Sequence, residues 1–393
     1  MTPVTATDLA IDRELASISE SFRFLVDLTP VNVSTARKEF LASGDSTPVF
    51  EYRDLEDFPE VIRARLEAID LAGVADPALA RLFEAKHREL RLQLAMLTAR
   101  GSSEFPHLSL QLYGPVSDAL DRQAREILAE IPKPHRGRGR CLDAIAIARV
   151  AEAEIESYRK QDQDLSVRIE VREDTSGVMV ANGVLLIAAT ASVGRSRLAG
   201  LLAHEVGTHI LTYFNGSRQP LKLMGSGLAG YEETQEGLAL IAEAAVGGLT
   251  WGRLRQIAAR VVAVKRLLEG YEFAEVHREL SELYGFSTGG AFTIAMRVWR
   301  SGGLTKDAIY LRGLQELVEY LANGHDLTFL WLTFLWKGKM SLADLPLAEE
   351  LTQRGVLDRP AIVPTFLESE DARQRLAAVA ASARLHELIG ADG

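Results

Sequence analysis

The residues best suited to chemistry in this sequence are His204, Glu205 and His209. Imidazole nitrogens and carboxylate oxygens ligate hydrolytic zinc, and a glutamate beside a ligand can serve as a general base. In the common zincin motif the two histidines are four residues apart and share one helix face. Here they are five residues apart, so a regular helix would place them about 140° apart. Both can reach one ion only if the helix bulges, and Gly207 is the residue best able to absorb a π-type bulge.

This pattern of three fixed residues has an ordinary alternative, a helix with two unrelated histidines and a surface glutamate. Three neighbouring features favour a metal site: a strand pair before the helix, a glycine inside the motif, and acidic residues on the next helix. On that helix Glu232 and Glu236 share one face and can supply a third ligand, whereas Glu233 points elsewhere. Glu243 shares the face of Glu236 and can orient a ligand histidine.

The sequence around the motif predicts helices and one small sheet. Alanine and leucine dominate, and only 7% of residues are aromatic, which favours helices. Residues 166–172 alternate as a half-buried strand should, and residues 178–188 contain the hairpin pair Asn182-Gly183. The motif helix is expected over 195–214, followed by a glycine-rich loop over 215–230. The predicted fold class is mainly α (α+β): a helical protein with a small antiparallel sheet beside a zincin-like active-site helix.

Apolar residues at helical spacing predict the other helices, at 8–28, 60–69, 77–99, 117–131, 232–245, 252–269, 272–283, 291–299, 306–322, 343–354 and 372–389. Prolines and glycines break the chain at 132–140, and this arginine-rich run is interpreted as a solvated linker rather than an anion site. The expected domains are an N-terminal helical region (1–131), a metallopeptidase core with the sheet and both motif helices (132–250), and a C-terminal helical region that completes the cleft (251–393).

Charge and composition exclude several classes of function. A net charge of −10 argues against a nucleic-acid partner, which requires a basic surface. Cys141 is the only cysteine, so no disulfide can form within the chain, which suits a reducing cytosol. No signal peptide is visible at the N-terminus, and we expect a cytoplasmic location. The most apolar stretch, 327–336, is about half the length of a membrane span, so we expect a buried core helix and no membrane partner.

Two motifs carry a resemblance to known proteins. His204-Glu-Val-Gly-Thr-His209 and Gln235-Glu-Gly-Leu-Ala239 resemble the bacterial QEGLA-motif proteins, which are described as modulating flavohaemoglobin expression. These are similar to the eukaryotic microtubule-associated tyrosine carboxypeptidases, which remove the C-terminal tyrosine of α-tubulin and have a matching histidine–glutamate motif. Dipeptidyl peptidase III is a further parallel with a similarly lengthened motif. The resemblance runs over about residues 135–345 and takes in Arg218-Gln-Pro220, Arg297-Val-Trp-Arg300, Lys306-Asp-Ala-Ile-Tyr310 and Gly338-Lys339.

The resemblance implies zinc (Zn2+) held by His204, His209 and Glu236, with Glu205 as the catalytic base. It implies a metallopeptidase fold in which the motif helix carries the extra residue. The implied substrate is a peptide or protein C-terminus. This chain lacks a basic extension for microtubules and is acidic, so peptidase chemistry carries over better than recognition of tubulin tails.

A carboxypeptidase also needs a cation for the terminal carboxylate of its substrate. Arg297 and Arg300 are one turn apart and can grip that group, and Arg218 is a further candidate for substrate binding. Tyr310 can donate to the developing oxyanion, and strand 184–188 can pair with a substrate strand at its edge. From the residues alone, the alternatives are arginines paired with surface acids and a tyrosine packed at the edge of the core.

Two other functions stay open. A metal-binding regulator without turnover predicts bound zinc, no peptide hydrolysis and a protein partner. A helical scaffold whose histidines are packing residues predicts no metal. Glu205 favours catalysis, because a purely structural site has no use for a base beside its ligand. The remaining histidines are treated as structural, with His277 as a weaker candidate for the pocket.

Overall fold

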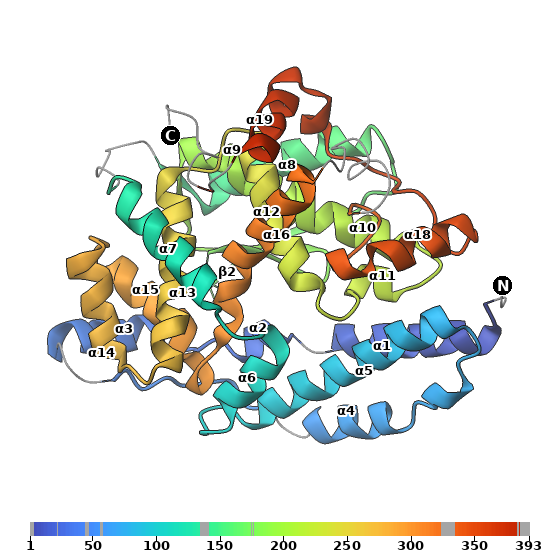
Figure 1. Cartoon of the computed structure of the whole chain (residues 1–393), viewed down its shortest axis with the longest axis horizontal. Coiled ribbons are helices and arrows are strands. Elements are labelled where there is room, and N and C mark those ends of the chain that lie inside the picture. The colour runs from blue at the N-terminus through green and yellow to red at the C-terminus, as the bar shows by residue number, and fades with distance from the viewer. Residues whose placement is uncertain are drawn as a thin grey trace.

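The computed structural model describes residues 4–21, 23–43, 47–55, 58–133, 141–173, 175, 177–323, 335–382 and 385. Helices make up most of these residues and small sheets the rest of the regular structure, so the predicted fold class is confirmed (Figure 1). Within these ranges every helix is too short or too polar to cross a lipid bilayer.

The N-terminal residues form the helices coloured blue to cyan in Figure 1. Local capping chemistry sets where they begin. The Asp76 carboxylate accepts two backbone amides at the start of α5, where Pro77 occupies the first turn, and the Ser117 side chain caps α7. The bounds are α1 (Ala6–Ser21), α2 (Phe24–Asp27), α3 (Val33–Ser43), α4 (Phe58–Glu67), α5 (Pro77–Thr98), α6 (Phe105–Tyr113) and α7 (Asp118–Glu130).

The sheet follows α8 (Ala144–Arg159) and has the strand order β2-β4-β3. β3 (Val178–Ala181) and β4 (Val184–Ala188) form the predicted hairpin, with φ of 48° at Asn182 and 73° at Gly183, as a type I′ turn requires. β2 (Arg168–Arg172) runs parallel to β4, so the sheet is mixed, not antiparallel as expected. The chain reverses after β2 and again at the hairpin, and two reversals make β4 parallel to β2. A separate antiparallel pair joins β1 (Cys141–Asp143) to β5 (Ser192–Gly194).

The position of β4 corrects one expectation about substrate binding. β4 is the central strand and is hydrogen-bonded on both sides, so residues 184–188 cannot receive a substrate strand. The edge strands are β2 and β3, and β3 is the one that lines the cavity described below. In the hairpin register, Ala181 faces Val184 beside the turn, so the backbone groups of Val178 and Val180 alternate away from β4 toward the outer edge. No other described strand pairs with that edge.

The motif helix consists of α9 (Arg195–His204), a π-helical turn called η2 (Glu205–Ile210), and α10 (Leu211–Arg218). The prediction of a loop over 215–230 is partly wrong, because α10 continues to Arg218 and α11 (Leu223–Ser226) follows. Two glycines explain the difference. A side chain at Gly216 would collide with the Met224 carbonyl, and one at Gly225 with the Ser217 backbone. The absence of side chains allows α10 and α11 to pack at close range.

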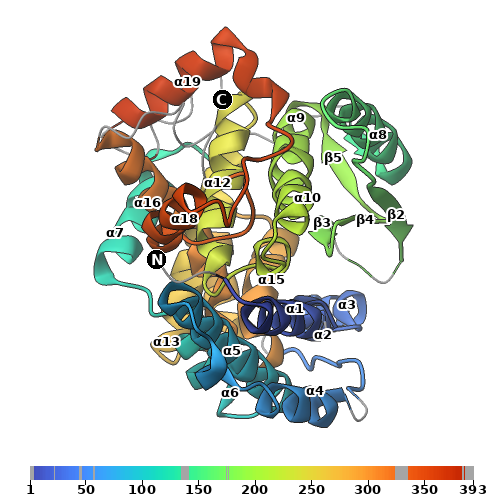
Figure 2. The same cartoon turned by 90° about the vertical axis from the view of Figure 1, so that its right-hand side faces the viewer.

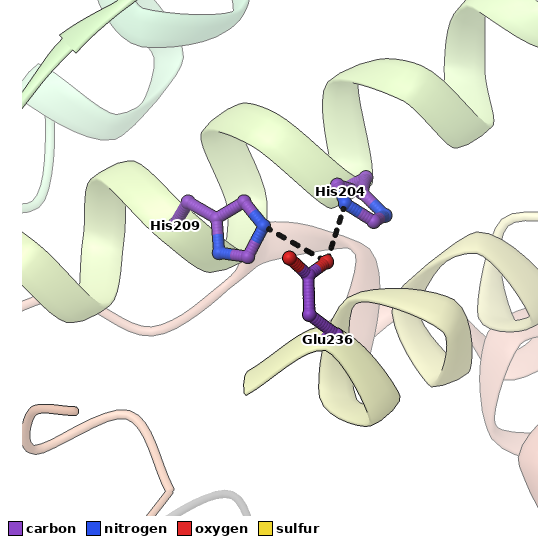
Figure 3. Close-up of side chains that lie close together, drawn as sticks. All are labelled: His204, His209 and Glu236. Carbon is purple, nitrogen blue, oxygen red and sulfur yellow. Dashed lines mark ion pairs between the residues drawn. The ribbon is translucent and has the colours of Figure 1, made fainter. Parts of the chain in front are cut away.

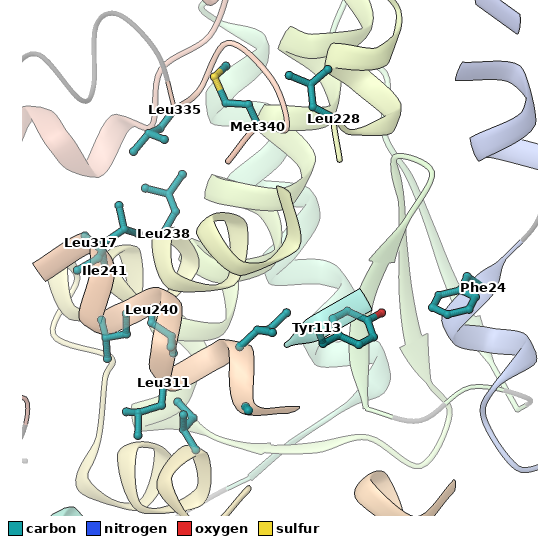
Figure 4. Close-up of a cluster of buried hydrophobic side chains, with 14 of the residues drawn as sticks. Phe24, Tyr113, Leu228, Leu238, Leu240, Ile241, Leu311, Leu317, Leu335 and Met340 are labelled. Carbon is teal, nitrogen blue, oxygen red and sulfur yellow. The ribbon is translucent and has the colours of Figure 1, made fainter. Parts of the chain in front are cut away.

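α12 (Tyr231–Ala245) lies between the α9–α10 helix and α16 (Ile309–Ala322) (Figure 2). The contact with α16 is close because Gly237 faces Gly313, where an added Cβ would meet backbone atoms. Leucines and isoleucines of both helices fill the core around this contact (Figure 4). The other helices of the C-terminal half are α13 (Trp251–Leu268), α14 (Phe273–Arg278), α15 (Thr288–Trp299), α18 (Leu345–Gln353) and α19 (Glu370–Ala381).

One hydrophobic cluster contains buried residues from all three expected domains. The division at 131/132 and 250/251 stays a prediction. The linker interpretation of 132–140 falls mostly outside the described residues. Of the apolar stretch 327–336, only Leu335 and Trp336 are described, and both are buried.

Candidate active site

The motif helix changes its hydrogen-bonding pattern within the motif itself. α9 ends at His204, and the next six residues form the π-helical turn. The Leu211 amide donates to the Val206 carbonyl, five residues back, where a regular α-helix would use the Gly207 carbonyl. The predicted departure from helical regularity near Gly207 is therefore confirmed.

The wider turn brings the two imidazoles together. The ring centroids of His204 and His209 are 4.9 Å apart. Both Nε2 atoms lie near Oε2 of Glu236 on α12, at 3.4 Å for His204 and 3.8 Å for His209 (Figure 3). One ligand atom from each residue lies within 4.8 Å of the other two. The three side chains expected to ligate a metal are thus close enough to hold one ion.

Glu236 has a buried carboxylate oxygen that the two imidazoles approach without a hydrogen bond. Its Oε2 is buried without a hydrogen-bond partner among the residues described, while Lys306 Nζ lies 3.6 Å from Oε1. Burial alone would raise the pKa of Glu236, but Lys306 and the two histidines outweigh burial and hold that pKa well below its usual range. A buried acceptor without a donor costs free energy, so this oxygen suits a cation.

A second glutamate orients His204 from behind. His204 Nδ1 lies 2.9 Å from Oε1 of Glu243, which is fully buried and pairs with Arg197 at 2.6 Å and Arg253 at 3.4 Å. Burial opposes ionisation, but Arg253, His204 and Arg197 together lower the pKa of Glu243 to about 2. The ionised carboxylate favours a proton on Nδ1, so Nε2 is the ring nitrogen that a metal could take. The predicted contact between Glu243 and one of the two motif histidines is confirmed.

A cavity of about 190 Å³ opens onto these side chains, and Glu205 lines it. Glu205 is 6% exposed. Burial raises the pKa of Glu205 to about 7, with Glu236 adding to the rise and His204 opposing it. A carboxylate with such a pKa can accept and release a proton near neutral pH.

The same cavity is rich in cations, but they are not equally available. Arg297 donates two hydrogen bonds to Asp307, at 2.5 and 2.6 Å, so this side of its guanidinium group is already paired within the protein. Arg300 donates from Nη1 to Thr29 at 2.9 Å, and its buried Nε has no partner among the described residues. Burial lowers the pKa of Arg300 to about 10, and nearby Arg297 adds to the effect. The lining cations are Arg53, Arg297, Arg300 and Lys306.

The other predicted residues divide into two groups. Tyr310 lines the cavity, and burial raises the pKa of its phenol. Arg218 lies outside the cavity, is 44% exposed, and pairs with Asp162 at 3.3 Å and Asp164 at 3.1 Å. Its position at the surface end of α10 removes it from the candidate site. His277 also lies outside the cavity.

Sequence reasoning missed part of the cavity wall. Leu25, Val26 and Thr29 line it from the N-terminal region, where Arg53 Nη1 donates to the Val26 carbonyl at 3.1 Å. These residues belong to no motif, so nothing in the sequence indicated them. Lys306 was detectable, because it lies one turn before Tyr310.

Comparison with known proteins gives the family. The sequence model for the microtubule-associated tyrosine carboxypeptidases matches residues 38–384. The chain belongs to this family. The match contains both motif helices and all the cavity residues from Arg53 onward. Membership of the bacterial QEGLA group stays a prediction.

Two individual likenesses are more distant. Microtubule-associated tyrosine carboxypeptidase 1 of Mus musculus is 29% identical over 201 residues, which are 48% of this chain and 40% of the mouse protein. The chain therefore matches less than half the length of that relative. A crystal structure described as that of a lipoprotein from Colwellia psychrerythraea has a TM-score of 0.43 and 14% identity, covering 89% of this chain and 70% of that chain.

Proposed function

We propose that this chain is a zinc-dependent carboxypeptidase that removes one residue from the C-terminus of a peptide or protein. The observation that carries the proposal is the π-helical turn, which brings His204 and His209 together at Glu236 and leaves Glu205 facing the same cavity. An aromatic residue such as tyrosine is the first candidate for the leaving residue, because of the family's name.

The residues present fit zinc. Two histidines and one glutamate form a donor set typical of hydrolytic zinc sites, and Oε2 of Glu236 is a buried oxygen without a donor. When bound, zinc supplies Lewis acidity that polarises a carbonyl and acidifies water. Glu243 holds His204 in the tautomer that a metal requires.

Glu205 is the proposed general base. Its carboxylate accepts a proton from the water that attacks the scissile carbonyl and passes that proton to the leaving amine. The raised pKa described above suits both transfers. Tyr310, in the same cavity, donates its hydroxyl proton in a hydrogen bond to the oxyanion that develops on the carbonyl.

The terminal carboxylate of the substrate is proposed to bind at Arg300. The unpartnered Nε and the excess of cations over carboxylates in the cavity support this assignment. Arg297 contributes to binding of that carboxylate mainly through its charge, because two of its guanidinium N–H groups already donate to Asp307. Upstream residues of the substrate would pair with β3, whose Val178, Met179 and Val180 line the cavity.

The test combines metal analysis with cleavage of matched peptides. The purified protein is analysed for zinc, and a peptide library is offered both with free C-terminal carboxylates and with amidated C-termini. We expect about one zinc per chain and release of single C-terminal residues from the free acids alone. Glu205→Gln should retain zinc and lose release, because it removes the base but no ligand.

Glu233→Gln is the matched control, because Glu233 pairs with Arg312 and does not line the cavity. It should release residues as the wild type does. A wild type without zinc would refute the proposal. Zinc without release from any peptide would also refute it and favour a metal-binding regulator.

A further inference from the structure

The π-helical turn leaves the Gly207 carbonyl without its usual helical donor. In a regular α-helix the Leu211 amide would donate to it, but here that amide bonds to Val206 and Thr208 carbonyls. The indole Nε1–H of Trp336 donates to the Gly207 carbonyl instead, at 2.8 Å. Trp336 is fully buried and lies 129 residues away in the sequence. The partner of this carbonyl is thus supplied by tertiary structure.

Two hydroxyl groups serve the same turn locally. Thr208 Oγ1 donates to the Ala203 carbonyl at 3.0 Å, and Thr212 Oγ1 lies 2.8 Å from the Thr208 carbonyl. The Thr212 hydroxyl is also 2.8 Å from Oε1 of Gln235, the neighbour of Glu236 on α12. Side-chain donors therefore support the turn at each end, and Trp336 supports its middle.

Trp336 is itself fixed to the motif helix. Asn215 of α10 donates from Nδ2 to the Trp336 carbonyl and to the Ile362 carbonyl, both at 2.8 Å. Its Oδ1 accepts the amides of Ala361 and Ile362, both at 3.0 Å. All the hydrogen-bonding capacity of the Asn215 amide is used in this way. The indole is therefore held in place from its own backbone.

We infer that Trp336 is a positioning residue for the metal ligands. Its N–H keeps the Gly207 carbonyl out of the α-helical pattern, and this keeps His209 turned toward His204 and Glu236. Without that donor, the buried carbonyl would be satisfied most easily by the Leu211 amide, and the regular helix would return the imidazoles to about 140° apart. The part of this inference that concerns metal rests on the proposed function. The part that concerns the turn does not.

The experiment compares Trp336→Phe with the wild type in two measurements. The first is hydrogen exchange of the metal-free protein, where the exchange rates of the amides of residues 205–212 should differ about tenfold from the wild type, because their carbonyl partners change, while those of α13 are unchanged. The second is binding of Co²⁺ and Zn²⁺ in competition with a chelator, where affinity should fall about tenfold and the Co²⁺ absorption spectrum should change. Thr208→Val, which removes one hydroxyl from the same turn, should act in the same direction.

Trp299→Phe is the matched control, because the same atoms are removed and the Trp299 ring packs on Phe273. It should leave both measurements unchanged. Equal exchange and equal metal affinity in Trp336→Phe and wild type would overturn the inference. If the wild type binds no metal, the proposed function fails, and the exchange measurement alone decides the role of Trp336.

Discussion

Neutralising Glu243 should weaken metal binding without removing any ligand. The Glu243 carboxylate lies 2.9 Å from His204 Nδ1 and its side chain is 1% exposed, so water cannot replace it. Glu243→Gln keeps an oxygen that can accept the Nδ1 proton but removes the negative charge. Glu243→Ala removes both. The two variants therefore separate the charge from the hydrogen bond.

The expected loss of zinc affinity follows from the contacts of Glu243. Loss of a group that orients a ligand histidine typically weakens metal affinity about 10- to 100-fold. Arg197 and Arg253 share the charge of Glu243, so His204 experiences only part of it. We expect about a tenfold loss for Glu243→Gln, or about 1.4 kcal/mol, and a loss toward about 100-fold for Glu243→Ala.

Zinc affinity is measured by competition with a chromophoric chelator, well below the unfolding temperature of each variant. Removing Glu243 also leaves Arg197 and Arg253 without a shared partner, so thermal unfolding is recorded in parallel. Glu233→Gln is the control, since it neutralises a carboxylate on the same helix that pairs with Arg312. Zinc affinity of Glu243→Ala within twofold of the wild type would show that the His204–Glu243 contact does not tune the site.

Three further changes test other parts of the structure. Asp307→Asn neutralises a buried carboxylate that pairs with Arg297 and should lower the free energy of unfolding by about 3 kcal/mol in a urea titration; an unchanged midpoint would contradict this. Burial and nearby Glu233 raise the pKa of Glu316 from 4.5 to about 7, so its contribution to stability is complete below 4.5 and is lost as the pH rises through 7. Glu316→Gln should therefore raise the melting temperature relative to wild type more at pH 8 than at pH 5, and the reverse order would refute the assignment. Val180→Pro removes an amide at the open edge of β3 and should raise KM for peptides without changing zinc content; an unchanged KM would show that this edge is not used.

The motif geometry could be predicted because its cause is local. A spacing of five residues from His204 to His209 is incompatible with a shared face on a regular helix, and a glycine between them marks where the helix can widen. Hairpin Asn182-Gly183 and the face shared by Glu236 and Glu243 are likewise set by neighbours in the sequence.

The rest depends on contacts between distant segments. The order of the strands, which makes β3 an edge strand, follows from how the chain crosses the sheet. The spacing of apolar residues along the sequence does not determine that order. The assignment of Arg218 to the site failed because a cation near a motif can equally serve a surface pair, here with Asp162. Trp336 could not be connected to Gly207, because hydrogen bonding to a widened turn leaves no pattern along the chain.

The hydrogen bond between Thr29 and Arg300 has a consequence for biosynthesis. It joins residues 271 positions apart and closes the cavity with the N-terminal segment. Contacts of such sequence separation form late, because the entropy of closing a long loop must be overcome first. During synthesis from the N-terminus, the motif helix leaves the ribosome well before Arg300 does. A nascent chain therefore carries the motif helix before the cavity that the helix lines is complete.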